Sequence, residues 1–290
     1  MQRRRFLHCL ATGALSCAAP VAAPADAEAL PRGVRLELTF SNPYSHPLSA
    51  QRFYCYLPAH RPPSQSLAEV RVSMAHRIQS DRFGHRILAL EFDAVPALKQ
   101  IIVQIKASVE MGRQDGAAPA PAVALDEADW LAPERYIESD AAPIRELAAR
   151  LKGATDAATV RAIYDWLRAN LRYAGYLPQD LGALQGLLTL RGDCTEYADL
   201  AVALARANRL PARMLGGYVA DGDLAPRPQD YHNWAEVYVD GRWLVLDAQK
   251  GNDLVQSERY IAYRIYRDGP SNEVGAAHRY RMDGQLQLSL

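Results

Sequence analysis

The chain has 290 residues, which is enough for about two domains of ordinary size. Hydrophobic residues make up 49% of it and charged residues 23%, as in a folded, soluble protein. The formal net charge is zero, and the sequence contains no nucleic-acid-binding motif, phosphate-binding loop or dinucleotide-binding glycine pattern. We therefore expect no nucleic-acid partner and no cofactor.

Residues 1–27 have the features of an export signal. Residues 3–7 read Arg-Arg-Arg-Phe-Leu, a twin-arginine pattern, and an apolar run leads to an Ala-x-Ala cleavage site at residues 25–27. The apolar run is too short and too rich in alanine for a good membrane span, although an N-terminal anchor is the alternative. We expect a bacterial protein in the periplasm or secreted, with no membrane span in the mature chain. Lipoprotein anchoring at Cys17 is the less favoured alternative.

Residues 28–112 are expected to form an antiparallel β-sandwich. Short segments with strand character alternate with turn signals such as Asn42-Pro43 and Pro62-Pro63. The predicted strands are residues 34–40, 52–58, 70–75, 87–92 and 101–109. Cys55 lies among aromatic residues in one of them and is interpreted as a core residue. The histidines of this region fit no zinc motif and are interpreted as solvated side chains: His46, His60, His76 and His85.

An Ala- and Pro-rich stretch, residues 113–128, is the predicted linker to a second domain, residues 129–290. That domain mixes helices and strands, so the whole chain is assigned to the α+β class. Helices are predicted at residues 143–152 and 155–173 and from residue 194, and strands at residues 213–219, 231–239 and 242–247. The glycine-containing stretch before residue 192 is interpreted as a loop, and the tail is expected to complete or dock on the sheet of this domain.

Cys194 is predicted to occupy the first position of a helix. Asp193 is a good N-cap residue, and Glu196 follows three residues later, which is the spacing of a capping box. A thiol at this position lies near free N–H groups and the positive end of the helix dipole, which favour the thiolate. Taken alone, such a cysteine is more often a small core residue. Glu196 and Asp199 are otherwise interpreted as surface charges of this helix.

A β-hairpin downstream supplies two further candidates. Asp240-Gly241 is a type I′ turn signal that pairs Val239 with Arg242, and this register brings Asp247 opposite Trp234. His232 then lies on the same face as Asp247, diagonally across the strand pair at about 7–8 Å. The sequence therefore predicts a His–Asp pair, in which the carboxylate orients one ring nitrogen and leaves the other for a thiol.

The segments around these residues resemble the core of the transglutaminase-like superfamily. The resemblance covers roughly residues 140–250 and is carried by residues 166–173, 192–198, 210–213, 217–218, 232–243 and Asp247. It implies a papain-like fold in which a helix starting with cysteine packs on an antiparallel sheet that carries histidine and aspartate. The family's catalytic residues correspond to Cys194, His232 and Asp247. The N-terminal sandwich resembles the β-domain that often precedes this core in bacterial members.

The resemblance implies attack of the thiolate on a peptide or carboxamide carbonyl, with a thioester intermediate and a peptide or protein substrate. Hydrolysis is favoured over cross-linking, because water is abundant. The chemistry needs no metal, and Asp221-Gly222-Asp223 is too short for a calcium loop. The alternative is a non-catalytic peptide-binding module on the same fold. An intact set of Cys194, His232 and Asp247 argues against that alternative.

Other polar and aromatic residues have less specific interpretations. The Cys194 backbone N–H is a natural oxyanion donor, and a second donor is left open among Gln179, Gln185 and Tyr173. Trp234 and Trp243 share the face of His232, where packing is favoured over substrate contact. Glu236 lies on the same face and is expected to pair with an arginine.

Overall fold

The structure is a computed structural model that describes residues 30–112, 127–252, 254, 257–269 and 272–289. The predicted leader, residues 1–27, and residues 113–126 of the predicted linker lie outside the described residues. Residues 127 and 128, assigned to the linker from the sequence, already belong to helix α1 (Glu127–Leu131).

The N-terminal part is the expected antiparallel β-sandwich. Its sheets have the strand orders β14-β1-β6-β3 and β13-β2-β5-β4. Within residues 30–112 the strands are β1 (Leu30–Ser41), β2 (Leu48–Leu57), β3 (Gln65–Val72), β4 (Arg77–Ser80), β5 (Arg86–Val95) and β6 (Gln100–Met111). The short strand β4 is an addition to the predicted set. Alternate side chains fill the space between the sheets, among them Leu38, Phe53 and Val103.

Cys55 lies in this sandwich core, as expected. Its side chain is buried, and burial raises the pKa of the thiol to about 12. A thiol with this pKa stays neutral at physiological pH, which fits a packing role.

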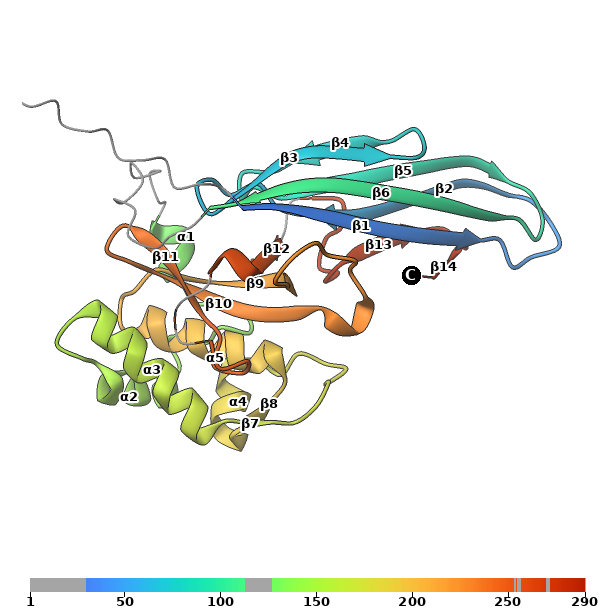
Figure 1. The fold of residues 1–290 in the computed structure, drawn as a ribbon. Helices are drawn as coiled ribbons and strands as arrows, with labels where there is room; N and C mark the ends of the chain where they lie inside the picture. The colour runs from blue at the N-terminus through green and yellow to red at the C-terminus, as the bar shows by residue number, and fades with distance from the viewer. Residues whose placement is uncertain (1–29, 113–126, 253, 255–256, 270–271, 290) are drawn as a thin grey trace, which may run out of the picture.

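The second part is a sheet with helices on one side. The sheet is antiparallel in the order β11-β10-β9-β12 and contains β9 (Ala212–Val219), β10 (His232–Val239), β11 (Arg242–Leu246) and β12 (Tyr260–Ile265). The helices are α2 (Ala142–Leu151), α3 (Asp156–Asn170), α4 (Gly182–Thr189) and α5 (Cys194–Ala207). In Figure 1 the sheet lies between the sandwich above and the helices below. This arrangement confirms the predicted α+β class.

Helix α5 is enclosed on all sides, because β10 and β9 cover one face and α2, α3 and α4 cover the others. Every residue from Thr195 to Arg206 is buried. The assignment of Glu196 and Asp199 to a solvent-exposed face was therefore wrong. Burial and the neighbouring carboxylates raise the pKa of Asp199 well above the usual range, so this side chain is a neutral acid.

Helix α4 lies in the stretch that was interpreted as a loop. Gly182, with φ +85°, stands at its start, a backbone conformation that other residues rarely adopt. At Gly186 a Cβ atom would lie 3.3 Å from the Cβ of Glu196, so the missing side chain allows α4 to approach α5 closely. Just beyond α4, β8 (Arg191–Gly192) pairs with β7 (Arg172–Tyr173). Gly186, one of the glycines that suggested a loop, thus serves a close helix–helix contact.

The C-terminal tail divides between the two parts. Strand β12 completes the second sheet, as expected, but β13 (Tyr280–Asp283) pairs with β2 and β14 (Gln287–Ser289) pairs with β1. The expectation that the whole tail joins the second domain was therefore wrong. The chain returns to its first domain and adds one strand to each sheet of the sandwich.

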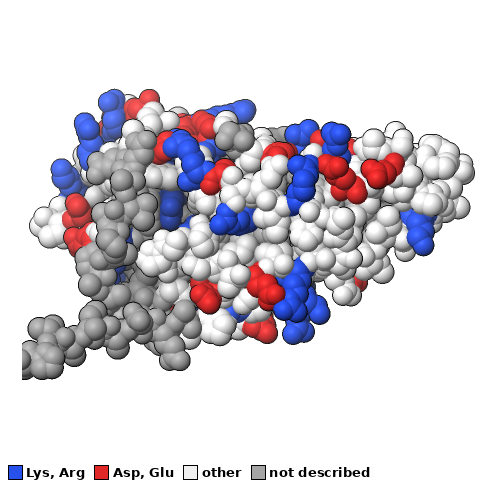
Figure 2. Space-filling model, turned by 90° about the horizontal axis from the view of Figure 1, so that it is seen from above, with Lys and Arg blue, Asp and Glu red and all other residues white. Residues whose placement is uncertain are grey.

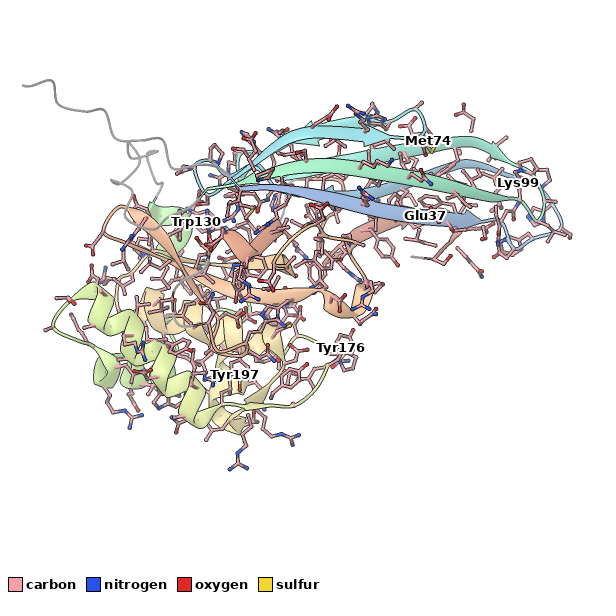
Figure 3. The ribbon with its side chains drawn as sticks, in the orientation of Figure 1. Glu37, Met74, Lys99, Trp130, Tyr176 and Tyr197 are labelled. Carbon is pink, nitrogen blue, oxygen red and sulfur yellow. The ribbon has the colours of Figure 1, made fainter. Side chains whose placement is uncertain are left out.

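Buried polar and aromatic groups hold the two parts together. Trp130 of α1, labelled in Figure 3, lies 5.7 Å from Phe83 of the sandwich and 6.0 Å from Trp243 of the second sheet, both between ring centroids. His85 is buried, with Nδ1 2.6 Å from Asp81 and Nε2 accepting the backbone N–H of Ile265 at 2.8 Å. The interpretation of His85 as a solvated side chain was therefore wrong.

Glu236 lies at the centre of this interface. Its carboxylate accepts hydrogen bonds from Arg61 of the sandwich at 2.9 Å and from Arg213 of β9 at 2.7 Å. All three side chains are buried, and Glu236 is 3% exposed. Burial acts to raise the pKa of this carboxyl, but the two guanidinium groups outweigh it and lower the pKa. The expected arginine pairing of Glu236 is confirmed.

The outer surface carries charges of both signs. In the view from above in Figure 2, Lys and Arg side chains are interspersed with Asp and Glu, which agrees with the net charge of zero. Among the described residues, no helix has the length and apolar character that are needed to cross a membrane.

Replacing Glu236 with Gln should destabilise the protein by about 3–5 kcal/mol, because two buried guanidinium groups lose their counter-charge. Since the folded-state pKa of Glu236 is lowered, its stabilisation is present at neutral pH and is lost as the pH falls below the usual glutamate range. Urea unfolding at pH 7 measures the change. The control is Glu69→Gln. Glu69 pairs with Arg71, whose side chain is 74% exposed, and the loss of this ion pair should lower the stability by under about 0.5 kcal/mol. Equal effects of both substitutions would contradict the prediction.

Candidate active site

The N-terminus of α5 positions Cys194. The Asp193 side chain accepts the backbone N–H of Thr195 at 2.7 Å, and Glu196 Oε2 accepts the N–H of Asp193 at 2.9 Å, which confirms the predicted capping box. Gly192 is required beneath it, because a Cβ atom there would lie 2.4 Å from the Cβ of Glu196. The first residue of the helix is therefore held rigidly.

The same two carboxylates hold the segment between β7 and α4. Asp193 Oδ2 accepts the N–H of Leu177, and Glu196 Oε1 accepts the N–H of Leu181, both at 2.9 Å. Tyr176 projects from this segment and is 84% exposed (Figure 3). A segment with an exposed aromatic side chain is thus fastened to the helix end that carries Cys194.

The hairpin of β10 and β11 has the predicted register. Asp240 and Gly241 have φ values of +50° and +81°, as a type I′ turn requires, and Val239 pairs with Arg242. The last pair before the candidate aspartate is Ala235 with Leu246. The turn therefore sets the position of Asp247 relative to β10.

His232 and Asp247 form a buried pair. Nε2 of His232 lies 2.7 Å from Oδ2 of Asp247. The same oxygen accepts the Tyr260 hydroxyl at 2.8 Å, and Oδ1 accepts the backbone N–H of Lys250 at 3.1 Å. Burial acts to raise the pKa of Asp247, but these hydrogen bonds and the charge of His232 lower it overall. The carboxylate is thus ionised, so Nε2 donates to it and Nδ1 is left for another partner.

The sulfur of Cys194 also lies at the start of β10. It accepts a hydrogen bond from the backbone N–H of Asn233, the residue that follows His232. Burial raises the pKa of the thiol to about 11, the carboxylates of Asp193 and Asp247 also raise it, and the N–H groups of Asn233 and Cys194 lower it. From the sequence, only the N–H groups and the helix dipole were considered, and both favour the thiolate. In the folded chain, burial opposes ionisation of the thiol.

The three candidates for a second oxyanion donor lie on different segments of the chain. Tyr173 pairs with Gly192 in the β7–β8 ladder, and burial together with the charge of Cys194 raises its pKa, so it is close to the thiol. Gln179 is exposed in the segment before α4, and Gln185 is exposed on α4. Of the three, only Tyr173 has an electrostatic interaction with Cys194 among those described.

The two tryptophans on the His232 face of the hairpin pack against neighbouring side chains. Trp234 is 1% exposed, and its ring stacks on His232 with a centroid distance of 6.4 Å. Trp243 packs against Tyr238 and the guanidinium of Arg213. The packing interpretation is confirmed, and Trp234 restricts the orientation of the imidazole.

Tyr260 is a member of this site that sequence reasoning missed. It lies in an aromatic-rich stretch of the tail, to which no function was assigned, and its hydroxyl reaches Asp247 only because β12 pairs with β9. Hydrophobic patterning and spacing carry no signal for such a contact. In the part of the chain that the structure describes, no group of three or more His, Cys, Asp or Glu side chains is arranged for a metal ion.

Comparison with known proteins finds a family match in the second part of the chain. Residues 145–248 match the family model of the transglutaminase-like superfamily, and this segment includes Cys194, His232 and Asp247. The chain therefore carries a transglutaminase-like core, as the sequence motifs predicted. No curated protein matches the chain in sequence.

The fold is similar to that of a solved structure. A candidate cysteine protease from Cytophaga hutchinsonii superposes with a TM-score of 0.59 at 22% identity, over 90% of this chain and 91% of that one. The periplasmic domain of TgpA from Pseudomonas aeruginosa, bound to ethylmercury, gives a TM-score of 0.37 at 17% identity, over 77% of this chain and 91% of that one. The similarity to the Cytophaga hutchinsonii protein extends beyond the core to most of the chain.

The pH dependence of Cys194 alkylation tests whether the imidazole acts on the thiol. In His232→Ala the thiol should react with iodoacetamide only at alkaline pH, because burial raises its pKa and the base that could accept its proton is gone. In the unmodified protein the reaction should extend to lower pH, because His232 can accept the thiol proton as the sulfur reacts. Peptide mapping by mass spectrometry follows each cysteine of the full chain separately, with buried Cys55 as the internal reference. Identical profiles in both proteins would contradict the prediction.

Proposed function

We propose that this protein is a cysteine acyl-transfer enzyme that cleaves amide bonds of peptides or proteins. The observation that carries the proposal is the 2.7 Å contact between His232 and Asp247, placed at the start of β10 where Asn233 contacts the sulfur of Cys194. A nucleophile, a base and a group that orients the base are the parts that covalent acyl transfer requires.

In the first half-reaction, His232 Nδ1 accepts the thiol proton as Cys194 Sγ attacks the substrate carbonyl carbon. The oxyanion accepts a hydrogen bond from the backbone N–H of Cys194. The tetrahedral intermediate then collapses, the C–N bond breaks, and the imidazolium gives its proton to the leaving amine. The product of this step is a thioester on Cys194, and Asp247 stabilises the imidazolium while it exists.

In the second half-reaction a nucleophile resolves the thioester. We propose water as the main acceptor, because it is abundant, with His232 taking its proton and returning that proton to the sulfur. An amine acceptor would give cross-linking by the same steps. The raised pKa of Cys194 means that the thiol is largely neutral at rest, so the proton transfer to His232 belongs to the reaction itself.

That same neutral thiol favours a second candidate function, a peptide-binding module without catalysis. A site of this kind would bind extended peptides next to Tyr173 and Tyr176, which are both exposed. The intact His232–Asp247 pair favours the enzyme.

Replacing Cys194 with Ala should abolish cleavage of fluorescein-labelled casein and leave the unfolding midpoint nearly unchanged. Asp247→Asn should lower the rate by about a hundredfold or more, because the imidazole loses the carboxylate that orients it. His232→Ala should be inactive, whereas its matched control His76→Ala, at an exposed site, should keep full activity. Incorporation of dansylcadaverine into casein, measured in parallel, reports transfer to an amine. A protein that binds peptides equally well with and without Cys194, and cleaves none, would establish the binding module instead.

We also propose that residues 1–27 direct the protein to the periplasm or outside the cell. The support is the arginine pair Arg3-Arg4 and the Ala-x-Ala site at residues 25–27. Replacing both arginines with Lys keeps the charge and should retain the precursor in the cytoplasm, as cell fractionation will show. Export that is unaffected would contradict a twin-arginine route, and labelling with a radioactive fatty acid at Cys17 would establish the lipoprotein alternative.

A further inference from the structure

A chain of hydrogen bonds leads from the protein surface to the residue after Cys194. Nε2 of His278 lies 3.1 Å from Oδ2 of Asp180, and Nδ1 lies 2.8 Å from the hydroxyl of Tyr266. The Tyr266 hydroxyl donates to Asn233 Oδ1 at 3.2 Å, and Asn233 Nδ2 donates to Thr195 Oγ1 at 3.0 Å.

The outer end of this chain is accessible and the inner end is buried. The side chains of His278 and Asp180 are 40% and 29% exposed, whereas Asn233 and Thr195 are buried. Asn233 is also the residue whose backbone N–H contacts the sulfur of Cys194. A change of protonation at the surface can therefore alter the side-chain bonds that hold the residue next to the nucleophile.

The donors and acceptors of the chain define the protonation state of His278. Asn233 uses its amide nitrogen on Thr195, so its oxygen can only accept, and Tyr266 must give it the single hydroxyl proton. The Tyr266 oxygen is then an acceptor for Nδ1 of His278. The Asp180 carboxylate can only accept from Nε2. Both ring nitrogens donate, so the complete chain requires the imidazolium form of His278.

The charged groups around His278 fit this assignment. The pKa of Asp180 is lowered, chiefly by the hydrogen bond from His278 and against the effect of burial, so this carboxylate is a stable counter-ion. Tyr231 donates its hydroxyl proton to the backbone carbonyl of His278 at 3.2 Å. A cation on another element, Arg264, has its guanidinium over the Tyr266 ring at 4.1 Å, and the adjacent Arg279 lies over the ring of Tyr231.

We infer that His278 is a positioning residue, which in its imidazolium form keeps Asn233 in place beside the Cys194 sulfur. When His278 loses its proton, Nδ1 becomes an acceptor, Tyr266 turns its hydroxyl proton to it, and the Asn233 Oδ1 atom loses its donor, so that Asn233 is held only through Thr195. The inference rests on the proposed cysteine chemistry and adds a second histidine, whose protonation state acts on the site through Asn233.

Two substitutions at position 278 separate the two protonation states. In His278→Gln the amide nitrogen can donate to Asp180, but the amide oxygen then accepts from Tyr266, so this variant mimics neutral histidine. It should lower kcat about five- to tenfold at low pH and flatten the alkaline decline. His278→Arg keeps the charge and several donors at all pH values, and should retain activity above the pH at which the unmodified protein declines. Asp180→Asn removes the counter-ion and should move the decline to lower pH.

The measurement is the pH profile of kcat in the full chain, with the exposed His76→Gln as the matched control. The pH profile of Cys194 alkylation in the same variants requires no substrate, so it tests His278 even if casein is not cleaved. Profiles in His278→Arg and His278→Gln that coincide with that of the unmodified protein would overturn the inference. A purely structural role of His278 would lower kcat by the same factor at every pH in both variants, which also overturns it.

Discussion

The burial of helix α5 is the constraint on which the rest of the structure depends. A helix that is enclosed on all sides cannot leave its first N–H groups to water, so the chain must supply acceptors from within. Asp193 and Glu196 do this, and their remaining oxygens hold the segment that carries Tyr176. The position of Cys194 and the shape of the surface beside it therefore follow from one set of buried hydrogen bonds.

The sandwich contributes to the site through β12. Gln65 forms hydrogen bonds to both backbone groups of Ala262, and His85 accepts the N–H of Ile265, so the sandwich fixes this strand at two points. The same strand carries Tyr260, which bonds to Asp247, and leads directly into Tyr266, which bonds to Asn233. The N-terminal domain thus supports both the His232–Asp247 pair and the chain that ends at His278. The N-terminal domain is thus part of the support of the site, in addition to being a domain joined by a linker.

The electrostatics of the site act differently on the nucleophile and on the base. Burial and two carboxylates disfavour the thiolate of Cys194, whereas Asp247 is ionised and favours a positive charge on His232. The permanent charge next to the base is thus the carboxylate of Asp247. A transient imidazolium is the state that this arrangement stabilises, and it forms when the thiol proton is transferred.

The sequence by itself determined the features that depend on near neighbours. The capping box at Asp193 and Glu196 and the register that the Asp240-Gly241 turn imposes were predicted correctly, because a cap and a two-residue turn are fixed by a few adjacent residues. The fold class followed from the pattern of strands and helices together with the resemblance to a known core. Only the tertiary structure decided that Asp199 and His85 are buried, that β13 and β14 return to the sandwich, and that Tyr260 reaches Asp247. These outcomes depend on contacts between segments far apart in the chain, and side chains with the same local pattern can face either solvent or another element.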